Sequence, residues 1–95
     1  MTNTAALVYA DFMKVDLENR LILTTRGTAE DLERLNLKLE PGLRLTFYNP
    51  DSDDAGNRDD LIAHGVVQYD EKNDRWVAVI TWEEIKNQSQ LPALT

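Results

Sequence analysis

The densest group of side chains that could do chemistry is the acidic run Asp51–Asp60, which holds five carboxylates and one arginine. Aligned on an EF-hand calcium loop, Asp51, Asp53, Gly56 and Asp59 fall at the first, third, sixth and ninth positions. The fifth and twelfth positions of such a loop must supply oxygen ligands, but here they are Ala55 and Ile62. We therefore interpret the run as a solvated hairpin loop and predict no metal and no cofactor, with a divergent calcium site as the alternative.

Catalytic pairs are the second kind of chemistry to consider. His64 is the single histidine, and the two serines, Ser52 and Ser89, fall in the acidic run and near the C-terminus. Glu83 and Glu84 are adjacent, so their side chains point in different directions and do not form a facing acid–base pair. The lack of cysteine excludes thiol catalysis, disulfides and cysteine-bound metals. We predict that the protein is not an enzyme.

Aromatic and charged side chains are the candidates for an interaction surface. Tyr48 and Tyr69 could stack on a partner beside Arg44 and Arg75, and Trp82 lies at the end of an expected strand. The predicted surface comprises Tyr48, Tyr69, Trp82, Arg44, Arg75, Asp53, Asp54 and Asp59. A net charge of −7, from 10 Lys+Arg and 17 Asp+Glu, argues against nucleic acid, which needs a basic surface. Nucleic-acid binding remains an alternative if Arg20, Arg44 and Arg75 lie on neighbouring strands and form a local basic patch.

Length and composition set the class of the protein. With 95 residues, 42% of them hydrophobic, the chain suits one domain with one modest core. No window approaches the roughly 18 apolar residues of a membrane span. No basic residue precedes the short apolar stretch Ala5–Tyr9, so it does not resemble a signal peptide. We predict a cytoplasmic protein that is not bound to a membrane.

Apolar segments with alternating or β-branched residues predict about five short strands. The expected strands are Leu7–Val15, Arg20–Thr25, Leu43–Tyr48, Leu61–Tyr69 and Arg75–Trp82. The first two would form a hairpin about the turn Asp16–Asn19, and the last two would form another. In the third strand we expect Phe47 to point inward and Thr46 and Tyr48 outward. Gly65 is expected to mark a bulge or a bend.

One helix is expected, at Thr28–Leu35, with Thr28 as its N-cap and acidic residues in or just after its first turn. Asn36 would end it in the left-handed conformation. The polar segment Asn87–Thr95 is predicted to be a flexible tail, which leaves residues 1–86 as a single domain.

Five short strands in so short a chain typically close into a small barrel, since closure removes exposed edges. Over about half of the chain the sequence resembles SH3-like barrels. Leu37–Leu45 resembles their turn and strand entry, Arg75–Val79 their tryptophan strand, and Leu7–Phe12 their opening strand. The resemblance implies a mainly β fold, an SH3-like antiparallel barrel with one short helix. The alternative is an open α+β sheet with the helix across one face.

The resemblance does not imply binding of proline-rich ligands, because Val77 stands where peptide-binding SH3 domains have a second tryptophan. The layout is also similar to short uncharacterised bacterial proteins. We predict a non-enzymatic protein-interaction or assembly module, a monomer or weak homodimer, that offers a sheet face or edge to a protein partner. A divergent calcium- or nucleic-acid-binding small barrel is the alternative. We also expect that changing Asp53, Asp54 and Asp59 to Asn leaves the fold intact.

Overall fold

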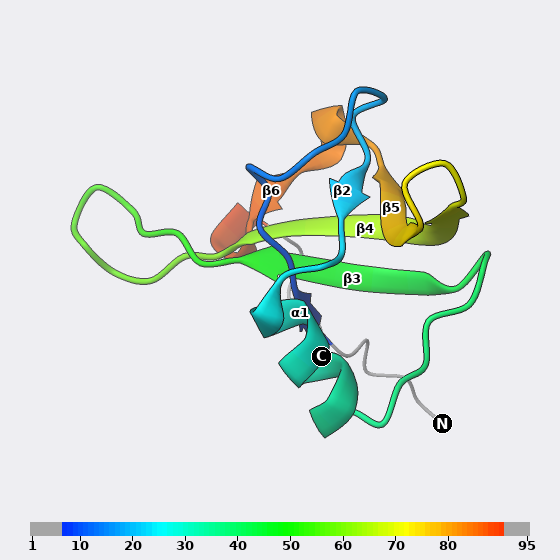
Figure 1. Ribbon diagram of the computed structural model, residues 1–95. Coiled ribbons are helices and arrows are strands. Elements are labelled where there is room, and N and C mark those ends of the chain that lie inside the picture. The colour runs from blue at the N-terminus through cyan, green and yellow to red at the C-terminus, as the bar shows by residue number, and fades with distance from the viewer. Residues whose placement is uncertain (1–6, 91–95) are drawn as a thin grey trace.

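A computed structural model describes residues 7–90 of the chain (Figure 1). In chain order these residues form β1 (Leu7–Tyr9), β2 (Leu21–Ile22), α1 (Arg26–Arg34), β3 (Arg44–Asn49), β4 (Leu61–Asp70), β5 (Arg75–Ile80), the 3₁₀ helix η1 (Trp82–Glu84), β6 (Lys86–Asn87) and the 3₁₀ helix η2 (Gln88–Gln90). Among these helices none has the length and apolar character needed to cross a membrane.

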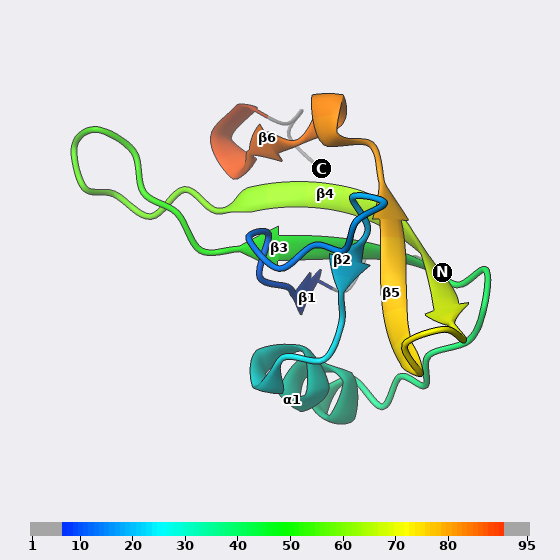
Figure 2. The same cartoon turned by 45° about the horizontal axis from the view of Figure 1, so that its top comes forward.

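The strands form one six-stranded sheet in the order β1-β3-β4-β5-β2, and β6 pairs with the beginning of β4. All pairs are antiparallel except β1 and β3, which run parallel. The two outer strands, β1 and β2, do not pair with each other, so the described sheet is open and is not a closed barrel. Figure 2 shows α1 beside β1, below the sheet. The structure is therefore mainly β, and it is consistent with the open α+β alternative.

The predicted N-terminal hairpin forms only beside its turn, where Val15 and Leu21 make an antiparallel bridge. Asp11 ends the first strand early, because its carbonyl accepts the amide of Lys14 at 2.9 Å and its carboxylate accepts the amide of Met13 at 2.9 Å. As a result, β1 pairs with β3 instead of with β2, and β2 pairs with β5. The turn at Asp16–Asn19 forms with Asn19 at φ 60°. A single bridge beside it is all that remains of the expected pairing.

The helix begins earlier than predicted. Its N-cap is Thr25, whose hydroxyl accepts the amide of Thr28, so Thr28 lies inside the first turn and is fully buried. The hydroxyl of Thr28 donates to the carbonyl of Tyr9 at 2.6 Å, which joins α1 to β1. The shift leaves the first turn without an acidic residue, and Glu30 and Asp31 follow just after it. Asn36 follows the helix at φ 56°, as predicted.

The backbone of both outer strands is bonded to neighbouring segments. The carboxylate of Asp31 in α1 accepts the amide of Tyr9 at 2.8 Å, so α1 covers the outer edge of β1. The amide of Ile22 in β2 donates to the carbonyl of Lys14 at 3.0 Å. Such contacts block the addition of another strand.

The β4–β5 hairpin is confirmed, and its turn ends with Asp74 at φ 54°. The pairing of β4 passes through Gly65 on both sides without an inserted residue, so there is no bulge at this position. Trp82 lies in η1 rather than at the end of a strand, because β5 ends at Ile80. Of the predicted tail, residues 87–90 fold as part of β6 and η2. The remainder, residues 91–95, lies outside the described residues.

The core lies between the sheet and α1 and includes Phe47 and Val67, both fully buried. Thr46 was expected to point outward into solvent, but only 8% of it is exposed. The reason is its position in β3, which has β1 on one side and β4 on the other, where Thr46 hydrogen-bonds to His64. Tyr48, also expected outside, is half-buried, with its ring edge-on to that of Tyr9 at 5.8 Å.

Candidate functional site

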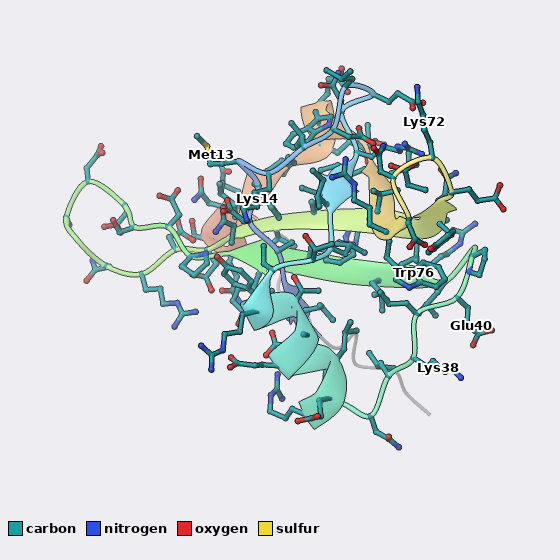
Figure 3. The ribbon with its side chains drawn as sticks, viewed as in Figure 1. Met13, Lys14, Lys38, Glu40, Lys72 and Trp76 are labelled. Carbon is teal, nitrogen blue, oxygen red and sulfur yellow. The ribbon has the colours of Figure 1, made fainter. Side chains whose placement is uncertain are left out.

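An open groove of about 590 Å³ lies between two turns, and we name it the turn groove. One wall comes from the β1–β2 connection and the other from the β4–β5 turn. The lining residues are Val15, Asp16, Leu17, Glu18 and Arg20 on the first wall, and Tyr69, Asp70, Glu71, Lys72, Asn73 and Arg75 on the second. The β2–β5 pairing brings these distant segments together. In Figure 3 Lys72 stands on the yellow turn of the second wall.

A network of buried charges joins the two walls. Asp70, whose side chain is 6% exposed, lies 3.7 Å from Nη2 of Arg20 and 3.6 Å from Nε of Arg75 through its Oδ2. Asn73 donates its side-chain amide to the same oxygen at 2.9 Å. Arg20 also donates through Nε to Oδ2 of Asp16 on its own wall at 2.7 Å. Because Arg20 binds carboxylates of both walls, the network holds the groove in a fixed shape.

The two buried carboxylates have lowered pKa values. Burial is the largest influence on Asp16 and works to raise its pKa, but hydrogen bonds from the backbone and side chain of Arg20 and from the Glu18 amide outweigh it. For Asp70 the hydrogen bond from the Asn73 side chain is the largest influence and lowers the pKa against the effect of burial. The positive charges of Arg20 and Arg75 lower it further. Both groups therefore favour the folded state in their ionised form.

We expect acid to destabilise the protein through these two groups. A carboxyl whose pKa is lower in the folded state than its ordinary value of 3.8 adds stability above that value. This stability is lost as the pH falls through the folded-state pKa, because the unfolded chain takes up protons first. The urea midpoint should therefore rise between about pH 3 and pH 5. A midpoint that is flat or falls over this interval would contradict the assignment.

Exposed apolar side chains gather around the turn groove. Of the five large hydrophobic residues exposed in the described part of the chain, Val15, Leu17 and Tyr69 line the groove, and Met13 precedes its first wall. Leu17 is fully exposed, and Met13 is 87% exposed. Figure 3 shows Met13 on the blue connection, away from the sheet. Exposed apolar side chains beside a groove are typical of docking sites.

Tyr69 and Arg75 are the two predicted interaction residues that the groove brings together. The ring of Tyr69 packs edge-on against Trp76, with centroids 4.9 Å apart, and its hydroxyl donates to the carboxylate of Asp74. These contacts fix the aromatic side chain in the second wall. The Nε atom of Arg75 is buried without a hydrogen-bond partner, although it faces Asp70.

Trp82 supports the groove from outside. It packs against the core, and its indole N–H donates to the carbonyl of Asn19 at 2.7 Å. This bond ties η1 to the turn that carries the first wall. Trp82 was predicted as part of an exposed interaction surface; its place in the structure is a support for the wall.

Arg44 and Tyr48 lie away from the turn groove. Arg44 lines a second hollow of about 400 Å³, and neither Arg20 nor Arg75 lines it. Tyr48 is half-buried; burial raises its pKa, and the nearby carboxylate of Asp31 raises it further. The predicted arginine patch is thus reduced to Arg20 and Arg75, both of which face Asp70.

The second hollow contains a pair that the sequence reasoning missed. Oγ1 of Thr46 lies 2.9 Å from Nδ1 of His64, because the β3–β4 register places the two residues opposite each other. The sequence analysis pairs His64 with the serines alone. The register of β3 and β4, which sets Thr46 opposite His64, is the signal that reveals this pair. A nucleophile–histidine site also needs a group that orients the histidine, and within residues 7–90 His64 has no hydrogen bond to a carboxylate.

The acidic run forms an arm that extends from the sheet between β3 and β4 (Figure 1). It is a hairpin loop, as predicted, but several of its carboxylates make specific bonds. Asp53 accepts the amides of Ala55 and Asn57 at 3.0 and 2.9 Å. Asp59 accepts the amide and the hydroxyl of Ser89 at 2.9 and 2.6 Å. The interpretation of the arm as merely solvated is therefore wrong for these two residues.

Because Asp59 makes bonds that Asp54 does not, the same change to Asn should affect stability differently at the two positions. Asp59→Asn removes one of the two acceptor oxygens that hold Ser89, and it should lower the free energy of unfolding by about 1 kcal/mol. Asp54→Asn, at an exposed position with no side-chain hydrogen bond in the described structure, should leave stability unchanged or raise it slightly by removing repulsion. Urea unfolding of both variants measures the difference. Equal stabilities would show that the Asp59–Ser89 contact contributes nothing.

Metal binding finds no support in the geometry of the described residues, where no three His, Asp or Glu side chains converge on a common point. The acidic arm spreads its carboxylates along a hairpin. Asp53 is held by backbone amides, and Asp59 is held by Ser89.

Comparison of the chain with models of protein families, with curated proteins and with solved structures finds no match.

Proposed function

We propose that this chain is a non-enzymatic protein-interaction or assembly module and that the turn groove is its docking surface. The observation that supports this most strongly is that three exposed apolar side chains, Val15, Leu17 and Tyr69, line the turn groove. A fully exposed leucine gains nothing from folding, whereas in an interface it removes apolar surface from water.

The rigidity of the groove also supports this function. Arg20 connects Asp16 and Asp70 across the two walls, and Trp82 holds the first wall through Asn19. A groove that is already ordered loses little conformational entropy when a partner binds.

The alternatives have weaker support from the same residues. Nucleic acid would need Arg20 and Arg75 for its phosphates, but both already face Asp70, which a phosphate would have to displace. The likeness to SH3-like barrels stays a prediction from the sequence, because the described sheet is open. A calcium site in the acidic arm would have to replace the bonds that Asp53 and Asp59 make to the protein.

A peptide-display selection tests the proposal. Peptides selected on the wild-type protein should lose binding when Leu17 is changed to Asp. They should keep it when Val79, an exposed valine that lines the second hollow, is changed to Asp. The apolar-to-acid change is matched in the two variants, and circular dichroism verifies that both are folded. Peptides that bind Leu17→Asp as well as wild type, or that depend on Val79, would contradict the turn groove as the docking surface.

A further inference from the structure

We propose that the second hollow binds a small zwitterion whose carboxylate and ammonium groups are separated by an apolar carbon chain, as in an ω-amino acid. The volume of the hollow, about 400 Å³, is within the range of small-molecule sites. The hollow shares no lining residue with the turn groove. This inference is therefore independent of the proposed docking of a protein partner.

Residues from one face of three paired strands line the hollow. The pairing sets Arg44 of β3 beside Val66 of β4, and it sets Val66 beside Val79 of β5. Residues two apart in a strand share a face, so Thr46 and His64 form a second row next to the first. The first row thus runs from a cation across two valines, and the second row is polar.

Glu84 supplies a carboxylate from the opposite side of β4. It lies in η1, which follows β5, and its amide donates to the carbonyl of Thr81 at 2.9 Å. The bond from Trp82 to Asn19 holds η1 in place. Because β4 separates β3 from β5, the strand that carries the cation lies about 10 Å from the strand that leads to the anion.

The two charges of the hollow call for a ligand that carries both signs. Arg44 and Glu84 are exposed, and the ion pairs of residues 7–90 include neither of them. A simple anion is repelled by Glu84 and by the chain's net charge of −7, and a simple cation leaves Arg44 unpaired. A zwitterion pairs both side chains at once and adds no net charge.

The surface between the two charges selects the spacing within the ligand. Val79 is 40% exposed, and the partly buried Val66 lies beside it. A methylene chain laid across these valines removes apolar surface from water, with its carboxylate toward Arg44 and its ammonium toward Glu84. The two charges of an α-amino acid share one carbon atom, so such a molecule does not span the row of valines.

Titration with ε-aminocaproate tests the site, followed at constant pH by the NMR signals of the His64 imidazole. His64 lines the hollow and is the only histidine of the chain. Its signals should shift until the site is saturated. Three molecules with the same number of carbon atoms should bind at least about tenfold more weakly: caproate and hexylamine, which each lack one charge, and norleucine, an isomer whose charges share one carbon. Imidazole signals that do not respond to ε-aminocaproate would overturn the inference, as would equally strong binding of any of the three.

Substitution of the two charged residues tests which groups hold the ligand. Arg44→Gln and Glu84→Gln should each weaken the binding of ε-aminocaproate about tenfold. Glu83→Gln changes a neighbouring exposed carboxylate of η1 that does not line the hollow, and it should bind like the wild type. Glu84→Gln should also bind caproate more strongly than the wild type does, because the repulsion of the anion is reduced. If Arg44→Gln or Glu84→Gln binds ε-aminocaproate as Glu83→Gln does, the assignment of the two charges is wrong.

Discussion

Gly65→Ala should destabilise the fold by about 2–3 kcal/mol, because the centre of β4 has no room for a side chain. A methyl group on Gly65 would lie 2.8 Å from Cγ2 of Ile80 and 3.0 Å from Cε2 of Phe47. It would also lie 3.1 Å from the backbone oxygen of Val79, and both contacted side chains are buried. Neither the backbone nor the buried ring can move without disturbing the core. Urea unfolding followed by tryptophan fluorescence measures the loss.

Gly56→Ala is the matched control for this substitution. Gly56 lies in the acidic arm at φ 86°, with nothing within 4 Å of the added methyl group. Its substitution should lower the free energy of unfolding by about 1 kcal/mol, because the left-handed backbone conformation disfavours a side chain there. If Gly65→Ala lowers the free energy of unfolding no more than Gly56→Ala does, β4 is not closely packed at Gly65 between β3 and β5.

Asp70→Asn should produce the second large effect, a fall in melting temperature of roughly 10 °C. Asp70 faces Arg20 and Arg75 with a side chain that is 6% exposed. Its neutral replacement leaves Arg75 facing no other carboxylate in the described structure, whereas Arg20 keeps Asp16. Removing one partner of a buried ion pair leaves an uncompensated charge, and this costs more than the pair itself contributes.

The same variant has an acid-range signature. Because the pKa of Asp70 is lowered in the folded state, its replacement should flatten the rise in stability with pH that the wild type shows in acid. Glu71→Gln, an exposed neighbour on the same wall, is the control and should change neither quantity. An Asp70→Asn protein with wild-type melting temperature and wild-type acid sensitivity would show that the network does not hold the groove.

Features set by neighbouring residues could be predicted from the sequence. The β4–β5 hairpin, the turn at Asp16–Asn19 and the left-handed Asn36 all depend on local backbone preferences. The pairing of β1 was predicted wrongly because the parallel β1–β3 contact crosses α1 and more than thirty residues of chain. Short-range patterns favour a hairpin between adjacent strands and carry no information about such a crossover.

The candidate site was predictable only in part, for the same reason. Tyr69 and Arg75 were chosen for their residue types, and both line the turn groove. The opposite wall was missed because it is brought there by the β2–β5 pairing, which no local pattern indicates. Leu17 was placed in a turn without a functional role. Its full exposure beside a hollow is a property of the folded chain, which depends on how β2 pairs.

Amide chemical shifts recorded by NMR while a peptide selected on the wild-type protein is added test the turn groove most directly as the docking surface of this chain. The wild type should show peptide-dependent shifts confined to residues 15–20 and 69–75, which carry the two walls. The same shifts should be absent in Leu17→Asp. Shifts centred on Thr46, His64 and Val79 would contradict the proposal and place the contact at the second hollow.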